Sequence, residues 1–231
     1  MKSLLLILSV LLSSPIMALE KNIWQAEVPS KGIYIPKGYD TNDDIELIAE
    51  GYLPNLCYKN PHTLVTVEQN KVHVTLQAWT NDNGEVPCAE MIVPFIHTFS
   101  VGVLDRGNYE VLLNGKKTGE LFVEESSSSA IDDLIYANVE VIERVPGENK
   151  VIIHGHHPSF CLEFNEFQIF HNDKDVFSVL PVMKQVSDFC PLKMTPFSLE
   201  LEVPSSLENN PVLLHVRSMN GKSVNSLFMR Q

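Results

Sequence analysis

The chain has 231 residues, with 17 lysine and arginine side chains against 29 aspartate and glutamate side chains, so its formal net charge is −12. Such an acidic chain lacks the basic surface with which proteins bind nucleic acid or anionic lipid, and we expect neither as a partner. Hydrophobic residues make up 44% of the sequence, which is enough for a folded core, and the length fits one large domain or two small ones.

Residues 1–18 have the pattern of a secretory signal peptide. Lys2 gives a positive start, residues 4–12 are an apolar core, and the small Ala18 marks the expected cleavage site. This core is too short to cross a bilayer, which takes about twenty apolar residues. We therefore expect a secreted or periplasmic protein without an integral membrane segment. Cleavage removes one lysine and no acid, leaving 16 basic against 29 acidic side chains, or −13.

Two stretches of the chain share one spacing of glycine, proline, cysteine and phenylalanine. The pattern G-x-x-P-x-x-C occurs at residues 51–57 and 155–161, and C-x5-P-F occurs at residues 88–95 and 190–197. All four cysteines of the chain belong to these patterns. Self-similarity at an offset of about a hundred residues indicates two copies of one structural unit.

Four cysteines in an exported chain imply two disulfides, because oxidising compartments preserve such bonds. Four cysteines allow three pairings. Only Cys57 with Cys88 and Cys161 with Cys190 give each copy the same internal bond. Each bond would close a loop of about thirty residues and stabilise the fold by roughly 3–4 kcal/mol.

The first copy has the alternation of short β-strands. Residues 72–79 alternate with period two, which places Val72, Val74, Leu76 and Ala78 on one face. Turn residues at 81–84 predict a hairpin, and Asn114-Gly115 predicts another. The strands expected in this copy are residues 33–35, 45–50 (ending at Gly51), 72–79, 89–93, 95–101, 109–113 and 121–123.

A serine-rich run separates the copies. Residues 126–130 have the composition of a linker, so we place a boundary there between domains at 19–125 and 131–231. A short linker leaves hinge freedom unless a contact between the domains buries apolar surface. The strands expected in the second copy are residues 135–142, 151–154 (ending at Gly155), 164–170, 175–180, 197–203, 212–216 and 223–229.

Six or seven short strands per hundred residues predict an all-β protein of two tandem immunoglobulin-like β-sandwich domains, each with one internal disulfide. The pattern at residues 51–57 resembles the G-x-L-P-N-x-C strand end of immunoglobulin-like modules in secreted bacterial proteins. The second copy departs from that pattern at His157 and Ser159, which stand at its Leu and Asn positions. The resemblance implies a fold and carries no catalytic residues. A cysteine spacing near thirty, shorter than in antibody domains, predicts a disulfide placed differently from theirs.

Three histidines, His154, His156 and His157, precede Cys161. Histidines this close in sequence suit zinc or copper. The equivalent positions of the first copy hold no histidine, and Cys161 is expected to be disulfide-bonded. We therefore favour surface histidines, and expect no metal and no other cofactor.

An acidic segment and two aromatic residues complete the candidate sites. Asp40, Asn42 and Asp44 have the spacing that begins a calcium loop, but Ile45 replaces the glycine such a loop requires, so an acidic turn is favoured. Trp79 and Tyr52 are candidate binding residues. We expect Trp79 to lie in the core or an interface and tyrosines near Cys57 to pack on the disulfide.

The sequence contains no G-x-S-x-G or H-E-x-x-H motif, and no cysteine remains outside the expected disulfides. We therefore expect a non-enzymatic, exported binding or structural protein that presents strand edges and loops to a protein or glycan. The alternatives are a periplasmic chaperone-like assembly factor that donates an edge strand, a protease inhibitor, and a small metal carrier. The acidic charge and the repeated cysteines count against the chaperone, because that class uses basic residues between its domains.

Overall fold

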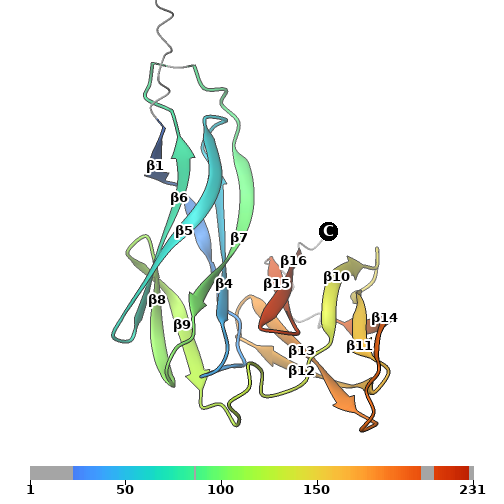
Figure 1. Cartoon of the computed structure of the whole chain (residues 1–231). Coiled ribbons are helices and arrows are strands. Elements are labelled where there is room, and N and C mark those ends of the chain that lie inside the picture. The colour runs from blue at the N-terminus through green and yellow to red at the C-terminus, as the bar shows by residue number, and fades with distance from the viewer. Residues whose placement is uncertain (1–22, 86, 204–210, 229–231) are drawn as a thin grey trace, which may run out of the picture.

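A computed structural model describes residues 23–228 except residue 86 and residues 204–210 (Figure 1). The expected signal peptide at 1–18 lies outside the described residues. Within the described part the chain forms strands joined by turns, and no helix there is long and apolar enough to cross a membrane. The fold is all-β, as predicted, with two tandem immunoglobulin-like β-sandwiches.

The N-terminal half forms two sheets. A 6-stranded sheet has the order β1-β6-β8-β9-β3, with β5 also paired to β6, and a 3-stranded sheet has the order β2-β4-β7. The strands are β1 (Trp24–Glu27), β2 (Ser30–Tyr34), β3 (Tyr39–Asp40), β4 (Ile45–Leu53), β5 (Tyr58–Glu68), β6 (Lys71–Thr80), β7 (Val93–Gly102), β8 (Gly107–Leu113) and β9 (Lys116–Glu124).

The C-terminal half repeats this plan. A 3-stranded sheet has the order β10-β11-β14, and a 4-stranded sheet has the order β12-β13-β15-β16. Both halves contain a parallel pair at the same place in the plan, β6 with β8 and β13 with β15, and the N-terminal half also pairs β3 with β9 in parallel. The strands are β10 (Asn138–Arg144), β11 (Lys150–Ser159), β12 (Leu162–His171), β13 (Val176–Gln185), β14 (Leu192–Glu202), β15 (Val212–Ser218) and β16 (Lys222–Phe228).

The repeated residues occupy equivalent places in the two halves. Gly51 on β4 is the cross-strand partner of Phe95 on β7, and Gly155 on β11 is the partner of Phe197 on β14. A Cβ atom at Gly155 would lie 2.7 Å from Cζ of Phe197 and 2.0 Å from the carbonyl oxygen of Asn138. The glycines therefore make room for an aromatic ring and a close backbone, and the prediction that each ends its strand was wrong. Both strands continue past the glycine.

Gly155→Ala is expected to lower the free energy of unfolding by about 2–3 kcal/mol, because the added methyl overlaps a neighbouring carbonyl and the strand must shift. Gly32→Ala is the matched control, since no atom lies within 4 Å of its Cβ position. Urea unfolding of both variants measures the difference. Equal stability of the two variants would contradict the close-packing role of Gly155.

Each disulfide pairs as predicted, Cys57 with Cys88 and Cys161 with Cys190. Each joins the turn after the repeat's glycine strand to the segment leading into β7 or β14. The bonds therefore lie at one end of each sandwich rather than across its centre. Two disulfides indicate that the protein resides outside the reducing cytosol.

The alternation on β6 is confirmed, since Val72, Val74, Leu76 and Ala78 are between 0% and 1% exposed. The hairpin predicted at residues 81–84 was wrong. Gly84 does adopt a positive φ of 77°, but β6 and β7 belong to different sheets, so the segment crosses from one sheet to the other. Most of the strand expected at 89–93 is likewise outside β7, which begins at Val93.

Candidate functional site

A buried ion pair joins the two halves. Asp43 follows β3 and Arg217 lies on β15, and their side chains are 2% and 4% exposed. Arg217 Nη1 donates to Asp43 Oδ2 at 2.9 Å, while Nη2 donates to the other carboxylate oxygen. Asp132 accepts a further bond from Nη2 at 3.3 Å. A guanidinium held by both oxygens of one carboxylate fixes orientation as well as distance. We call this region, with the groups described next, the junction.

Aromatic and imidazole groups surround the pair. Tyr39 lies 5.2 Å beneath the Arg217 guanidinium, and its hydroxyl donates to the carbonyl of Glu46 at 2.8 Å. The same hydroxyl lies 3.2 Å from Nε2 of His215, whose Nδ1 is 2.8 Å from Oδ1 of Asn225. Burial lowers the pKa of His215 to about 4, so this imidazole is neutral at pH 7.

Apolar packing continues the junction on one side. Tyr34 on β2 and Ile48 on β4 form a buried cluster with Val176 on β13 and Leu213 on β15. The contact between the halves thus combines an apolar cluster with a buried ion pair. This is the kind of contact that removes the hinge freedom a short linker would otherwise allow.

The serine-rich segment is held by hydrogen bonds. Asp133 accepts bonds from the backbone amide of Ser128 at 3.2 Å and from Nδ2 of Asn42 at 2.9 Å. The backbone amide of Ser126 donates to Thr41 Oγ1 at 3.1 Å. Hydrogen bonds donated to its carboxylate, first from the Ser127 side chain, hold the pKa of Asp133 well below its usual range. The segment between the copies is therefore an ordered part of the junction.

The calcium-like spacing at residues 40–44 does not produce converging ligands. Asp40 Oδ1 accepts from the backbone amide of Asn42 at 3.2 Å, while the Asn42 side chain bonds Asp133. Asp44 instead accepts a bond from Ser100. Each of the three side chains has a different partner, as expected for an acidic turn and not for a calcium loop.

Acid is expected to destabilise the junction through His215. Its pKa is about 4 when folded and 6.5 when exposed, so only the unfolded chain binds this proton between those values. The contribution of the neutral His215 side chain to the free energy of unfolding is complete above pH 6.5. It is lost as the pH falls from 6.5 toward 4. Asp40, Glu46 and Asp132 act in the opposite direction, because burial raises the pKa of each carboxyl.

Comparison of wild type with His215→Asn isolates the histidine. Urea unfolding at pH 7 and pH 5 should show roughly 2 kcal/mol more loss in the wild type than in the variant, from the linked proton. The variant's own packing cost is present at both pH values and cancels in this comparison. Equal losses of stability between pH 7 and pH 5 in the two proteins would contradict the low pKa assigned to His215.

The three candidate histidines do not converge. His154 Nε2 lies 3.1 Å from Glu143, and His156 Nδ1 lies 2.9 Å from Glu140. The His157 ring instead stacks on Phe197, with centroids 4.6 Å apart. Across the residues that the structure describes, no group of three or more His, Cys, Asp or Glu side chains is placed to hold a metal ion. Each histidine has a partner of its own.

Trp79 lies on the outer face of β6 and is 40% exposed, so it is not in the core, and the core half of the expectation was wrong. The reason is strand parity, since the opposite face of β6 holds the core residues and one face of the sheet stays open. The Trp79 ring stacks on His62 with centroids 6.0 Å apart. Tyr52 is half-buried on β4, opposite Pro94.

Exposed apolar side chains gather beside each disulfide. We call residues 54–57, 81–85 and 87–92 the first tip, and residues 158–161 and 184–194 the second tip. In the first tip the large exposed apolar residues are Leu56 (43%), Met91 (52%) and Ile92 (66%). In the second tip they are Phe160 (53%), Val186 (47%), Phe189 (79%), Leu192 (93%) and Met194 (62%).

The tips share local structure as well as composition. Asn55 Oδ1 accepts a hydrogen bond from the backbone amide of Cys57 at 2.9 Å, and Ser159 Oγ accepts one from the amide of Cys161 at 3.3 Å. Ser159 therefore replaces the repeat's asparagine without losing its bond. Neither tip was identified from the sequence. The signal that could have indicated them is the presence of apolar residues beside the repeated cysteines.

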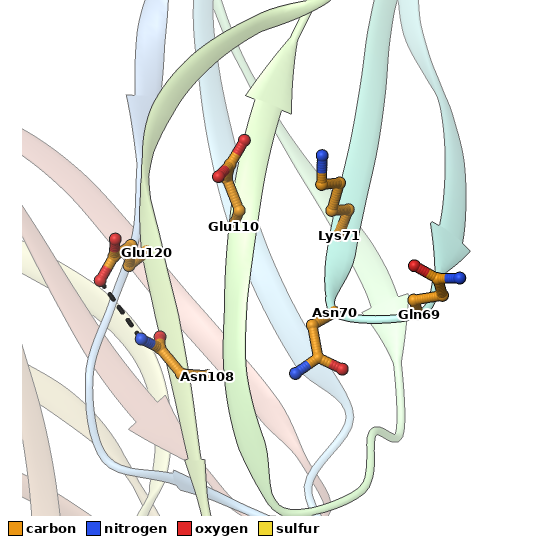
Figure 2. A pocket seen from close by; sticks show the side chains of 6 residues that line it. All are labelled: Gln69, Asn70, Lys71, Asn108, Glu110 and Glu120. Atoms are coloured by element: carbon orange, nitrogen blue, oxygen red, sulfur yellow. Dashed lines mark hydrogen bonds between the residues drawn. The ribbon is translucent and has the colours of Figure 1, made fainter.

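A polar hollow of about 380 Å³ lies at the other end of the first sandwich (Figure 2). Its lining residues are Gln69, Asn70, Lys71, Asn108, Glu110 and Glu120. None of the six is aromatic, and Lys117 lies 3.6 Å from Glu110 and 2.9 Å from Glu120. The carboxylates of this hollow are therefore already paired. We take the two apolar tips as the candidate functional site.

Comparison with known proteins adds one match. The family model described as the ORF11 beta-sandwich domain matches residues 47–123, which run from β4 to β9. No curated protein and no solved structure matches the chain significantly. The match covers about a third of the chain, the six-strand unit of the N-terminal half that includes the first tip.

Proposed function

We propose that the chain is an exported, non-enzymatic binding protein that contacts a protein partner through its two disulfide-bonded tips. The observation that carries the proposal is the repeated exposure of apolar side chains. Leu56 and Phe160 hold equivalent positions before a cysteine, and Ile92 and Met194 hold equivalent positions four residues after one. Clustered exposed apolar side chains are characteristic of interaction surfaces.

The organisation of the rest of the molecule supports a binding role over an enzymatic one. The buried titratable groups that we describe lie in the junction, where Asp43, Arg217, Tyr39 and His215 bind one another. Their hydrogen bonds hold the halves in a fixed arrangement. A rigid framework lowers the entropy lost when exposed loops bind a partner. Apolar tips favour a protein over a glycan, because glycans offer mainly polar groups.

Affinity capture tests the proposal. The mature chain, attached through its C-terminus, is incubated with extracellular and periplasmic extract of the producing cells, beside a variant that carries Ile92→Lys and Leu192→Glu. Val141→Glu is the matched control, since Val141 is 53% exposed on β10 and belongs to neither tip. We expect the wild type and the control to capture the same proteins and the tip variant to lose them. Capture that is indifferent to the tips would refute the proposal.

A further inference from the structure

The two tips lie at opposite ends of the molecule. β4 begins near the junction, where Ile48 packs, and runs to Leu53 beside the first tip. β13 begins at Val176 in the same cluster and runs to Gln185 at the second tip. At about 3.3 Å per residue, β4 runs roughly 17 Å from Ile48 to Leu53 and β13 roughly 30 Å from Val176 to Gln185, so each tip lies away from the junction. Figure 1 shows the loop before β7 and the loop between β13 and β14 at opposite ends.

The second tip presents a large apolar surface. Five side chains, exposed from 47% to 93%, contribute roughly 500 Å² at about 150 Å² for each fully exposed side chain. This approaches the upper limit for the largest apolar patch of a monomeric protein, roughly 600 Å². The backbone beneath it is fixed, because the amide of Val186 donates to the carbonyl of Cys161 at 2.7 Å. The tip is therefore preorganised.

The first tip offers a surface of similar kind. Its three apolar residues continue into Trp24 and Trp79, which lie at the same end of the sheet and are 37% and 40% exposed. Contact of the two tips would bury apolar area near the lower limit for specific interfaces, roughly 1,000 Å² in total. An interface of that size gives reversible association.

The charges of the tips are complementary. The loop of the first tip carries Asp82, Glu85 and Glu90 and no basic residue. The second tip carries Lys184 and Lys193 with one acid, Asp188. Lys193 Nζ lies 4.3 Å above the Phe160 ring, beside the apolar patch. In a chain of net charge −12, two copies of the first tip would repel each other, whereas the first tip and the second attract.

We propose that copies of the chain associate head to tail, with the second tip of one copy bound to the first tip of the next. The inference rests on the proposed function, because it names the protein partner of the tips. A contact between two different surfaces does not close on itself at a dimer, so association continues with concentration. The repeat explains how one chain carries both surfaces, since each tip is the same structural unit with different side chains.

Sedimentation velocity over a wide concentration range tests the proposal on the mature chain. The wild type and Val141→Glu should form species larger than dimers as concentration rises. Leu192→Glu places an acid where the acidic first tip binds, and Ile92→Lys places a base where the basic second tip binds. Each variant alone should stay monomeric. Their equimolar mixture should form dimers, because one intact tip remains on each partner. Phe189→Glu repeats the test at a second position that is 79% exposed.

Other outcomes identify different occupants and overturn the inference. A wild type that stays monomeric at all concentrations excludes the contact. Dimers formed by Ile92→Lys alone indicate that two second tips bind each other. Flotation with phosphatidylcholine vesicles that is lost in Leu192→Glu assigns the second tip to lipid. If the wild type is monomeric while capture from extract still requires the tips, this inference fails and the proposed function stands. If the wild type associates through the tips but capture from extract ignores them, the tips bind only another copy of the chain, and the proposal of a further protein partner fails.

Discussion

Arg217→Met is expected to lower the free energy of unfolding by about 3–5 kcal/mol, the largest effect of any single substitution that we predict. The methionine retains most of the side-chain volume but leaves Asp43 and Asp132 in the junction without their cation. Asp43 is 2% exposed and Asp132 is 12% exposed, so neither carboxylate regains water unless the junction opens. The substitution should therefore separate the halves as well as destabilise them. Urea unfolding gives the first effect, and the radius of gyration from X-ray scattering gives the second.

Two further variants decide whether burial is the cause. Lys150→Met removes a half-buried surface lysine that lies 3.8 Å from Glu148 and 3.7 Å from Glu200, and should change stability by less than about 1 kcal/mol. Arg217→Met combined with Asp43→Asn should recover part of the loss, because one of the two stranded carboxylates becomes neutral. A loss below about 1 kcal/mol for Arg217→Met alone would show that the junction admits water and that the halves are coupled mainly by the apolar cluster.

Local patterns predicted the local features of this fold. Alternation located β6 and its buried face because side-chain direction along a strand depends only on neighbouring residues. The disulfide pairing could be predicted because the repeat fixes which cysteines are equivalent. The hairpin at residues 81–84 failed for the opposite reason. Turn residues specify that the chain bends, but which strand pairs with β6 depends on contacts far away in sequence, here with β8 and β1.

The junction could not be predicted because its members are distant in sequence. Asp43 and Arg217 are separated by 174 positions, and each looks ordinary in its own segment. Asp43 stands in a polar turn, and Arg217 alternates with apolar residues at the end of a strand. His215 is 0% exposed beside them, although a histidine in that pattern suggests nothing unusual. Only the packing of β15 against the N-terminal half turns these residues into one buried cluster.

The tips could be predicted only in part. The repeated glycines, cysteines and phenylalanines were recognised, and their equivalence predicted where the copies have the same backbone. The exposure of Phe189 and Leu192 was not predicted, because an apolar residue in a loop can equally well fold back onto the core. The Cys161–Cys190 disulfide lies at the end of the sandwich, and these side chains are exposed beside it.

Removal of the Cys161–Cys190 disulfide by Cys161→Ala and Cys190→Ala is expected to lower the free energy of unfolding by roughly 3–4 kcal/mol. Its cysteines are 29 residues apart, and those of Cys57–Cys88 are 31 apart, so loss of either bond should have nearly the same entropic effect. For a protein whose total stability is about 5–15 kcal/mol, each bond is a substantial share. Urea unfolding of the two double variants, with the remaining bond verified by mass spectrometry, measures both losses.

The second tip should lose more than stability when its bond is removed. Without Cys190 the loop keeps the hydrogen bond from Ser159 Oγ to the carbonyl of Pro191, but no covalent link to the turn between β11 and β12. A mobile loop must be ordered again on binding, so self-association of the variant should weaken under conditions where the protein is still folded. The variant lacking Cys57–Cys88 gives the same comparison for the first tip. Unchanged association in both variants would mean that the hydrogen bonds alone hold the tips in their binding conformation.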